Sequence, residues 1–284
     1  MVRGFLFVGV TFLLAACGSL ELGASAPATF PVPTPFPEIA TTPSFQAWTT
    51  SRILAFRESM GSAPERPYIG LGLQILARPA ALEAVEAGEL ELVVSASEPP
   101  AGWFVTPLGW ERVVFAVHPG NPVRALSLQE LASIFRGQTV NWDALGGPDL
   151  AIQPVIPLEG DELRDHLAGR LLEGRRFTTL ALLGPSPEAT LALVGQDPGA
   201  IGILPLSTAN DRVALIQVEG IEARDREGRY PLEMEVLAFA PQEPGGVVRE
   251  WLAWLQAEGA LLSRAEGSSP EQGRRRVAPS PQFR

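Results

Sequence analysis

The sequence predicts an α/β protein that consists of two lobes with a cleft between them. Short apolar runs alternate with helical patterns between about residues 38 and 265, which is typical of α/β architecture with largely parallel sheets. The chain has 284 residues, and its apolar fraction of 46% can fill one large or two ordinary cores. A Pro/Gly/Asn cluster, His118–Pro122, directly follows a predicted strand. It indicates a crossing between lobes, and a second crossing is expected near residues 217–220.

The predicted strands are short runs rich in branched apolar residues, bounded by turn formers. The first predicted strand leads into Thr42-Pro43-Ser44, which opens a helix, and the last is followed by Glu219-Gly220. In chain order they are Ile39–Thr41, Leu90–Val94, Arg112–Val117, Ile152–Ile156, Leu180–Leu183, Ile201–Leu204 and Val213–Val218.

The predicted helices place their apolar residues on one stripe, or begin and end at capping residues. Residues 44–59 have such a stripe, Gly88 ends the next helix, and Ser127 with Glu130 forms a capping-box pattern before the third. In chain order they are Ser44–Ser59, Pro79–Ala87, Leu128–Phe135, Glu188–Gly195 and Val247–Ala257.

The N-terminal residues predict an exported lipoprotein. Met1–Arg3 supplies a positive region, and the apolar run Phe5–Ala16 is too short to span a membrane but suits a signal peptide, expected over residues 1–16. The run ends in Leu14–Gly18, which resembles the bacterial lipobox. The resemblance implies that Cys17 is the lipidation site and that acyl chains anchor the protein. The alternative is a plain signal peptide that happens to contain a Cys.

Both ends lie outside the predicted fold. Residues 17–37 are rich in Pro and small residues, and we expect a tether that holds the folded domain away from the membrane. Residues 267–284 are rich in Ser, Pro and Gly, and we expect a disordered tail.

Composition argues against several function classes. The net charge of −10 disfavours a nucleic-acid binder. The single Cys excludes an intrachain disulfide, and no metal site or cofactor is expected. We find no nucleophile elbow, P-loop or dinucleotide fingerprint, so no catalytic residues are predicted. Glu162 and His166 are one helical turn apart, a spacing that fits acid–base chemistry but is more typical of a surface pair.

Motifs in the middle of the chain are similar to the phosphate-type substrate-binding proteins of ABC transporters. The signature runs through Asn121-Pro122, Ile134–Gly137 and Asn141–Gly147, with Leu128–Phe135 as its short helix. Further matches in the family order are Ala87–Leu92, Asp197–Gly202 and Tyr230–Leu232.

The resemblance covers about residues 38–265 and implies a two-lobe type II periplasmic-binding-protein fold. Lobe one would comprise residues 38–116 with 217–265, and lobe two residues 117–216. Such a protein closes on a small ligand by hinge motion and delivers it to a permease.

Two segments of lobe one correspond to places where the family binds its anion with hydroxyls and backbone N–H groups. The first contains Thr41, Thr42 and Ser44, and the second contains Ser95 and Ser97. Ordinary N-capping and turn roles are the alternative for both segments.

The third segment departs from the family pattern. Where the family has an Arg followed by Ser-Gly-Thr, this chain has Glu159, Gly160, Asp161 and Glu162. Carboxylates cap a helix well but oppose a dianion at the same place. We expect Glu159→Ala with Asp161→Ser to raise oxyanion affinity. Arg164 either swings back toward the cleft or lies on a solvated helix face.

The sequence therefore predicts a lipid-anchored solute-binding component of an ABC importer, located in the cell envelope, on the outer face of the cytoplasmic membrane or in the periplasm. Phosphate or a related oxyanion is the favoured ligand. The alternatives are a neutral or cationic solute, and a non-transport lipoprotein that reuses the fold for sensing or envelope interaction.

Overall fold

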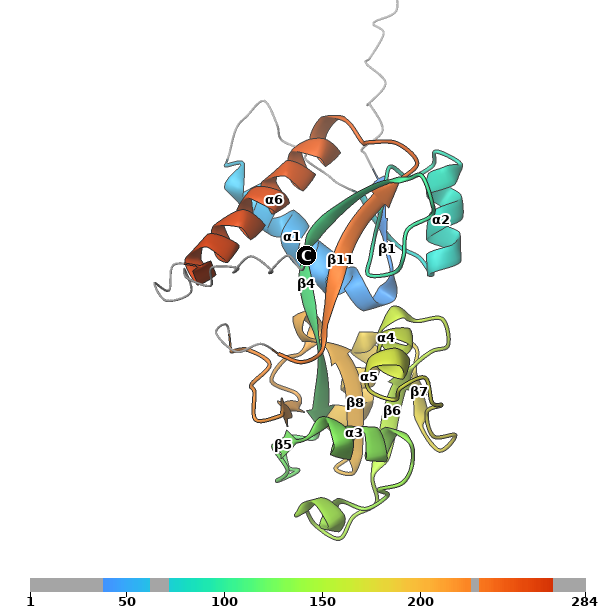
Figure 1. Cartoon of the computed structure of the whole chain (residues 1–284), viewed down its shortest axis with the longest axis vertical. Coiled ribbons are helices and arrows are strands. Elements are labelled where there is room, and N and C mark those ends of the chain that lie inside the picture. The colour runs from blue at the N-terminus through green and yellow to red at the C-terminus, as the bar shows by residue number, and fades with distance from the viewer. Residues whose placement is uncertain (1–37, 62–71, 226–229, 268–284) are drawn as a thin grey trace, which may run out of the picture. The chain divides into compact units, whose positions relative to one another are not determined.

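The computed structural model describes residues 38–61, 72–225 and 230–267, and these belong to one compact unit (Figure 1). The predicted signal peptide, Cys17, the tether and residues 268–284 of the tail lie outside the described residues. Within the described part, no helix combines the length and hydropathy that a membrane span requires.

One twisted sheet runs through both lobes in the order β2-β1-β3-β11-β4-β8-β6-β7, with β9 beside β4, while β5 and β10 form a separate ribbon. The strands are β1 (Glu38–Thr41), β2 (Gly72–Ile75), β3 (Val93–Ser95), β4 (Phe104–Val117), β5 (Ala125–Leu126), β6 (Gln153–Pro157), β7 (Leu182–Gly184), β8 (Ala200–Pro205), β9 (Ala214–Leu215), β10 (Gln217–Val218) and β11 (Glu233–Ala240).

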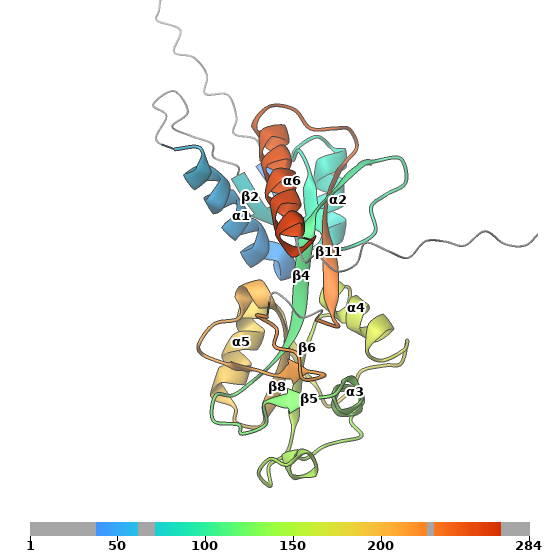
Figure 2. The same cartoon turned by 60° about the vertical axis from the view of Figure 1, so that its left-hand side comes forward.

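The helices form two groups, one around the lobe-one half of this sheet and one around the lobe-two half (Figures 1 and 2). In lobe one, α2 packs on β1 and β3, and α6 packs on β4 and α1. In lobe two, α4 packs on β6 and β8, and α5 packs on β6, β7 and β8. The helices are α1 (Gln46–Ser59), α2 (Arg78–Glu86), α3 (Leu128–Phe135), α4 (Glu162–Arg170), α5 (Pro187–Gln196) and α6 (Gly246–Gly267), and the short 3₁₀ turns are η1 (Pro43–Phe45), η2 (Trp142–Leu145) and η3 (Leu206–Thr208).

The long strand β4 connects the two lobes. Its residues 104–112 pair with β11, and its residues 113–117 pair with β8. β4 begins eight residues before the predicted start at Arg112. The pairing partner therefore changes within one continuous strand, and the predicted lobe boundaries in residue numbers remain a prediction.

The expectation of largely parallel sheets is only partly correct, because each lobe combines parallel and antiparallel pairs. The pairs β1–β2, β1–β3, β6–β7 and β6–β8 are parallel. The central pairs β3–β11, β4–β11 and β4–β8 are antiparallel. β4 runs from lobe one to lobe two and β11 runs in the reverse direction, so the two strands are antiparallel in the middle of the sheet.

The signature motifs lie in the core of lobe two. Ile134, Phe135 and Trp142 are fully buried. The Phe135 ring packs against Phe115 of β4 with centroids 5.6 Å apart, and the indole Nε1 of Trp142 donates to the carbonyl of Gly199 at 3.0 Å. These buried contacts stabilise the fold of lobe two.

Candidate functional site

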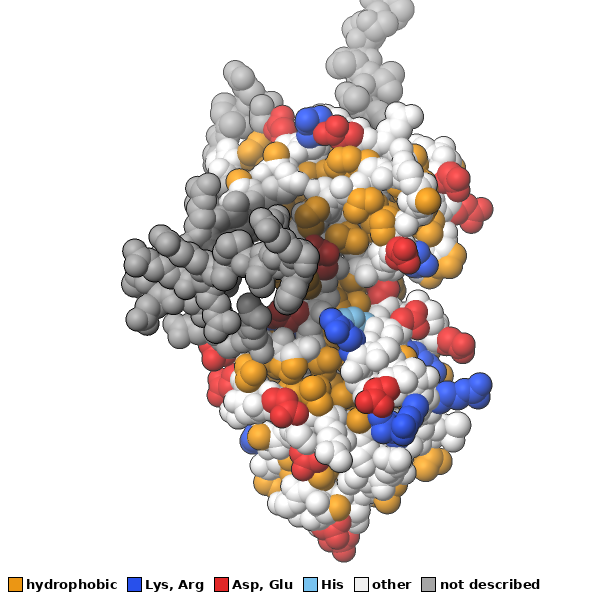
Figure 3. Space-filling view, viewed as in Figure 1, with side chains coloured by type: hydrophobic (Ala, Val, Ile, Leu, Met, Phe, Trp, Pro, Cys, Tyr) orange, Lys and Arg blue, Asp and Glu red, His pale blue; other side chains and the backbone are white. Residues whose placement is uncertain are grey.

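Four segments meet where the two lobes face each other. In lobe one, η1 follows β1 and the Ser95–Ser97 turn follows β3; in lobe two, α4 follows β6 and α5 follows β7. The carboxyl ends of parallel strands in α/β proteins are the usual place for ligand binding. Figure 3 shows acidic side chains at the waist between the lobes.

Glu162, the first residue of α4, connects both hydroxyl segments of lobe one. Its Oε2 accepts a hydrogen bond from the Thr42 hydroxyl at 2.8 Å, and its Oε1 accepts one from the Ser95 hydroxyl. The Glu162 side chain is buried, with 6% of the residue exposed. A carboxylate of lobe two is therefore held by hydroxyl donors of lobe one.

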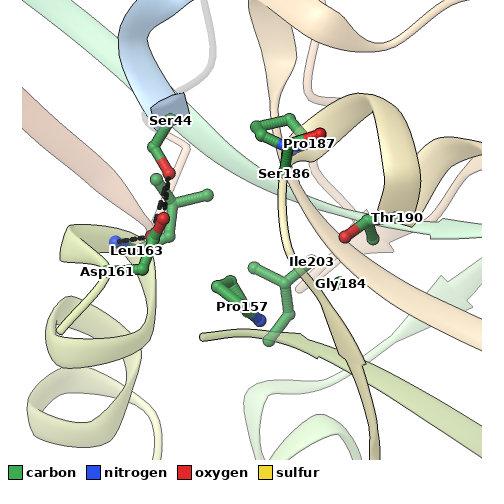
Figure 4. Close-up of a pocket in the computed structure, with 9 residues that line it drawn as sticks. All are labelled: Ser44, Pro157, Asp161, Leu163, Gly184, Ser186, Pro187, Thr190 and Ile203. Carbon is green, nitrogen blue, oxygen red and sulfur yellow. Dashed lines mark hydrogen bonds between the residues drawn. The ribbon is translucent and has the colours of Figure 1, made fainter. Parts of the chain in front are cut away.

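Asp161 makes the second connection between the lobes. The Ser44 hydroxyl lies 2.9 Å and 2.7 Å from its two carboxylate oxygens (Figure 4). The same carboxylate caps α4, because its Oδ1 accepts from the N–H of Leu163 at 2.9 Å. Asp161 thus fixes the start of α4 and joins it to η1.

Burial is the main influence on both carboxyl groups. It raises the pKa of Glu162, although hydrogen bonds from Ser95, Thr42 and the Ala96 N–H lower it. It also raises the pKa of Asp161, against hydrogen bonds from Ser44 and the backbone of α4. Among the described residues, neither carboxylate has an ion-pair partner. Neutral donors and the N-terminus of α4 favour the charged form of both groups, and burial opposes it.

Ser97 contacts the Ser95 hydroxyl. Its hydroxyl lies 2.6 Å from the Ser95 hydroxyl, and its N–H donates to that same oxygen at 3.0 Å. Ser97 therefore orients Ser95 and makes no hydrogen bond to the carboxylates.

The remaining predicted site residues point elsewhere. The Thr41 hydroxyl donates to the Val94 carbonyl and contacts Thr49 inside lobe one. Glu159 lies on the exposed turn before α4 and makes no hydrogen bond or ion pair with the described residues. Gly160 occupies that turn with φ +82°, a conformation that glycine adopts without strain. These three residues, as placed here, do not contribute side-chain donors or acceptors to the interlobe network.

A small cavity lies beside Asp161, with room for about one water molecule. Its polar lining includes Ser44, Ser186 and Thr190 (Figure 4). Ser186 caps α5, since its hydroxyl oxygen accepts from the Ala189 N–H at 3.2 Å. In the sequence, Ser186 could have been recognised as a helix cap, because it directly precedes Pro187 at the start of a predicted helix.

The structure places His166 and Arg164 away from the roles in the site that were considered for them. Glu162 uses its oxygens on Thr42 and Ser95, and His166 Nε2 is buried without a partner among the described residues, so the two do not form an acid–base pair. The Arg164 guanidinium donates to the Pro157 carbonyl at 3.0 Å and lies 5.6 Å from the Phe177 ring centroid. Arg164 therefore packs against its own lobe instead of extending to the carboxylates.

Glu162 is the site residue whose role the sequence reasoning missed. The sequence identified it as an acidic residue near the helix start, without distinguishing it from its acidic neighbours. The described residues contain no cluster of three or more potential metal-ligating side chains.

The sequence of this chain is similar to those of known proteins. A family model for the PBP superfamily domain matches residues 94–255. The phosphate-binding protein PstS of Bacillus subtilis (strain 168) is 28% identical over 147 residues, which are 50% of this chain and 49% of that protein. The match thus spans about half the length of this curated relative.

Solved structures share the fold over most of the chain. A putative phosphate ABC transporter substrate-binding protein with bound phosphate from Clostridium perfringens has a TM-score of 0.66 at 19% identity, covering 81% of this chain and 97% of that one. An ABC-type phosphate transport receptor from Vibrio cholerae has a TM-score of 0.56 at 20% identity, covering 81% and 98%. The reduced OxyR regulatory domain from Pseudomonas aeruginosa has a TM-score of 0.55 at 15% identity, covering 80% and 95%.

These matches and the strand order agree on one architecture. The two lobes, which share the continuous strand β4, form the type II fold that the sequence motifs predicted. The chain belongs to the family of PBP superfamily domains and has the two-lobe fold of periplasmic binding proteins.

Proposed function

We propose that the chain is the extracytoplasmic solute-binding lipoprotein of an ABC importer, and that it binds phosphate or a related oxyanion by hinge closure between its lobes. One observation carries the proposal: the hydroxyls of Thr42, Ser44 and Ser95 converge on the N-terminus of α4. Hydroxyls and a helix N-terminus are the groups that bind oxyanions without a fixed positive charge.

The comparisons support the same function. The curated relative is a phosphate-binding protein, and two structures with this fold are described as phosphate transport proteins. Binding between the lobes requires a chain that opens and closes, and the two-lobe fold is suited to hinge motion. The role needs no catalytic residue, cofactor or metal ion, and its protein partner would be the permease.

Cys17 supports the placement of the protein in the envelope. The lipobox-like sequence around it would yield an acylated N-terminus, and residues 17–37 would connect the anchor to the folded unit. The protein would then lie on the outer face of the cytoplasmic membrane or in the periplasm.

A second candidate is a binder of a neutral or cationic solute. The observation that favours it is the pair of carboxylates, Asp161 and Glu162, at the place where an anion would bind. Carboxylates accept hydrogen bonds from hydroxyl and amino groups, so they suit a ligand that donates. A sensing lipoprotein without transport function would use the same fold with a different partner.

Isothermal titration of the full chain in detergent tests the proposal. We expect phosphate to bind, and we expect the Ser95→Ala variant to bind it at least tenfold more weakly because a hydroxyl donor is lost. Ser51→Ala is the matched control, since it removes an exposed hydroxyl from α1. Binding of spermidine or a neutral solute without binding of phosphate would favour the second candidate.

A further inference from the structure

The donors that suit an external oxyanion are already used inside the protein. Thr42 and Ser95 both donate to the Glu162 carboxylate, and Ser44 donates to the Asp161 carboxylate. In each bond the hydroxyl donates and a carboxylate oxygen accepts, so lobe one donates and lobe two accepts.

The cavity next to these hydrogen bonds is too small for an oxyanion. The cavity beside Ser44 and Asp161 has room for about one water molecule. A tetrahedral oxyanion is several times larger than a water molecule. An external ligand therefore reaches the hydroxyls only after the lobes separate and the carboxylates leave them.

The bonds also hold the lobes together. Thr42 and Glu162 are 120 residues apart in the sequence, and Ser44 and Asp161 are 117 apart. Each bond joins a loop of lobe one to α4 of lobe two. Hydrogen bonds to charged groups contribute more than neutral ones, and those of Glu162 are shielded from water because its side chain is buried.

We propose that Glu162, together with Asp161, is an internal ligand: in the solute-free chain its carboxylate occupies the hydroxyls of Thr42 and Ser95, holds the lobes closed, and competes with an external oxyanion for the same donors. The identity of the competitor as an oxyanion rests on the proposed function. The internal contact itself rests on the geometry of this chain.

Two kinds of variant separate the two roles of this contact. Glu162→Ala removes both acceptor oxygens, so it removes the internal ligand and leaves every hydroxyl donor in place. Thr42→Val combined with Ser95→Ala removes the donors and leaves the carboxylate. Both changes release the lobes, but they act on an external oxyanion in opposite directions.

Two measurements test the proposal on the full chain. The distance between lobes is measured by fluorescence transfer between labels on Glu58→Cys of α1 and Gln129→Cys of α3, two exposed positions, in a Cys17→Ser background. Phosphate binding is measured by isothermal titration. Circular dichroism confirms that each variant is folded. Glu159→Ala is the matched control, because it removes an exposed carboxylate three residues from Glu162.

We expect the wild type and Glu159→Ala to give the short interlobe distance, and Glu162→Ala and the double hydroxyl variant to give a longer one. We expect Glu162→Ala to bind phosphate at least tenfold more tightly than the wild type, and the double variant to bind it more weakly. An unchanged distance in Glu162→Ala and in the double variant would overturn the proposal. So would weaker phosphate binding by Glu162→Ala. If no variant binds phosphate but the distances change as expected, the internal ligand stands and the proposed function fails.

Discussion

The Thr42 hydroxyl of lobe one donates to the Glu162 carboxylate of lobe two across 2.8 Å, although the two residues are 120 positions apart. The bond joins the loop after β1 to the first residue of α4. It makes the contact between the lobes a part of the folded structure instead of leaving it to a bound solute.

The two roles of Asp161 can be separated by substitution. Asp161→Ala removes both the cap of α4 and the acceptor for Ser44, so we expect the free energy of unfolding to fall by about 1–2 kcal/mol. Asp161→Asn keeps a side-chain oxygen that caps the helix, and we expect less than half of that loss. Urea unfolding measures both values. Equal losses in the two variants would show that the charge, and not the cap, stabilises this helix start.

Glu162 makes stability depend on pH in a defined direction. Burial raises its pKa in the folded state above the value in the unfolded chain, so the folded state binds the proton more tightly. The contribution of this group is fully present below the unfolded pKa and is lost as pH rises through the folded pKa. We therefore expect the stability of Glu162→Gln, relative to the wild type, to increase as the pH rises above 4.5, the ordinary pKa of this group.

Comparing variants isolates this effect from other groups, because Glu130 and His166 have lowered pKa values and act in the opposite direction. Urea unfolding at several pH values gives the difference curve. A flat difference curve would mean that the Glu162 carboxyl group has no raised pKa in the folded state.

Two glycines give opposite expectations for the same substitution. A Cβ at Gly199 would lie 2.5 Å from the Ala151 carbonyl oxygen, so Gly199→Ala should destabilise the protein by about 1–3 kcal/mol. Gly169 lies in α4 with open space around it, so Gly169→Ala should stabilise by about 0.5–1 kcal/mol. Thermal unfolding measures both. Similar shifts in the two variants would contradict the packing described for Gly199.

Local sequence patterns predicted helix α3 and the way it begins. Helix α3 has the predicted bounds, and its capping box is present: the Ser127 hydroxyl accepts from the Glu130 N–H, and the Glu130 carboxylate accepts from the Ser127 N–H. Both features depend on residues within one turn of each other. Short-range chemistry of this kind is readable from a sequence.

The first half of β4 was not predicted as a strand. It contains Pro107 and Gly109, residues typical of turns, and the structure accommodates them where the register shifts opposite Val236 and Leu237 of β11. The partner strand that makes this possible follows more than a hundred residues later. A pairing of this kind cannot be read from local propensity.

The sequence indicated the hydroxyl donors and Asp161 as candidates, but not Glu162. The family resemblance and the segments that follow the first two predicted strands indicated Thr42, Ser44 and Ser95. Among the acidic residues before and at the start of α4, however, only the packing of the lobes decides which one is buried. Glu159 remains exposed on the turn, while Glu162 enters the interlobe contact.

Arg164 provides the last test, because it is the cation of α4 nearest to the two carboxylates in sequence. Its guanidinium donates to the Pro157 carbonyl and lies over the Phe177 ring, so it stabilises lobe two. We expect Arg164→Ala to lower the free energy of unfolding by about 1 kcal/mol and to leave phosphate affinity within about twofold of the wild type. Urea unfolding and isothermal titration measure the two quantities. A loss of phosphate affinity greater than tenfold would show that Arg164 leaves Phe177 and reaches the anion when the lobes open.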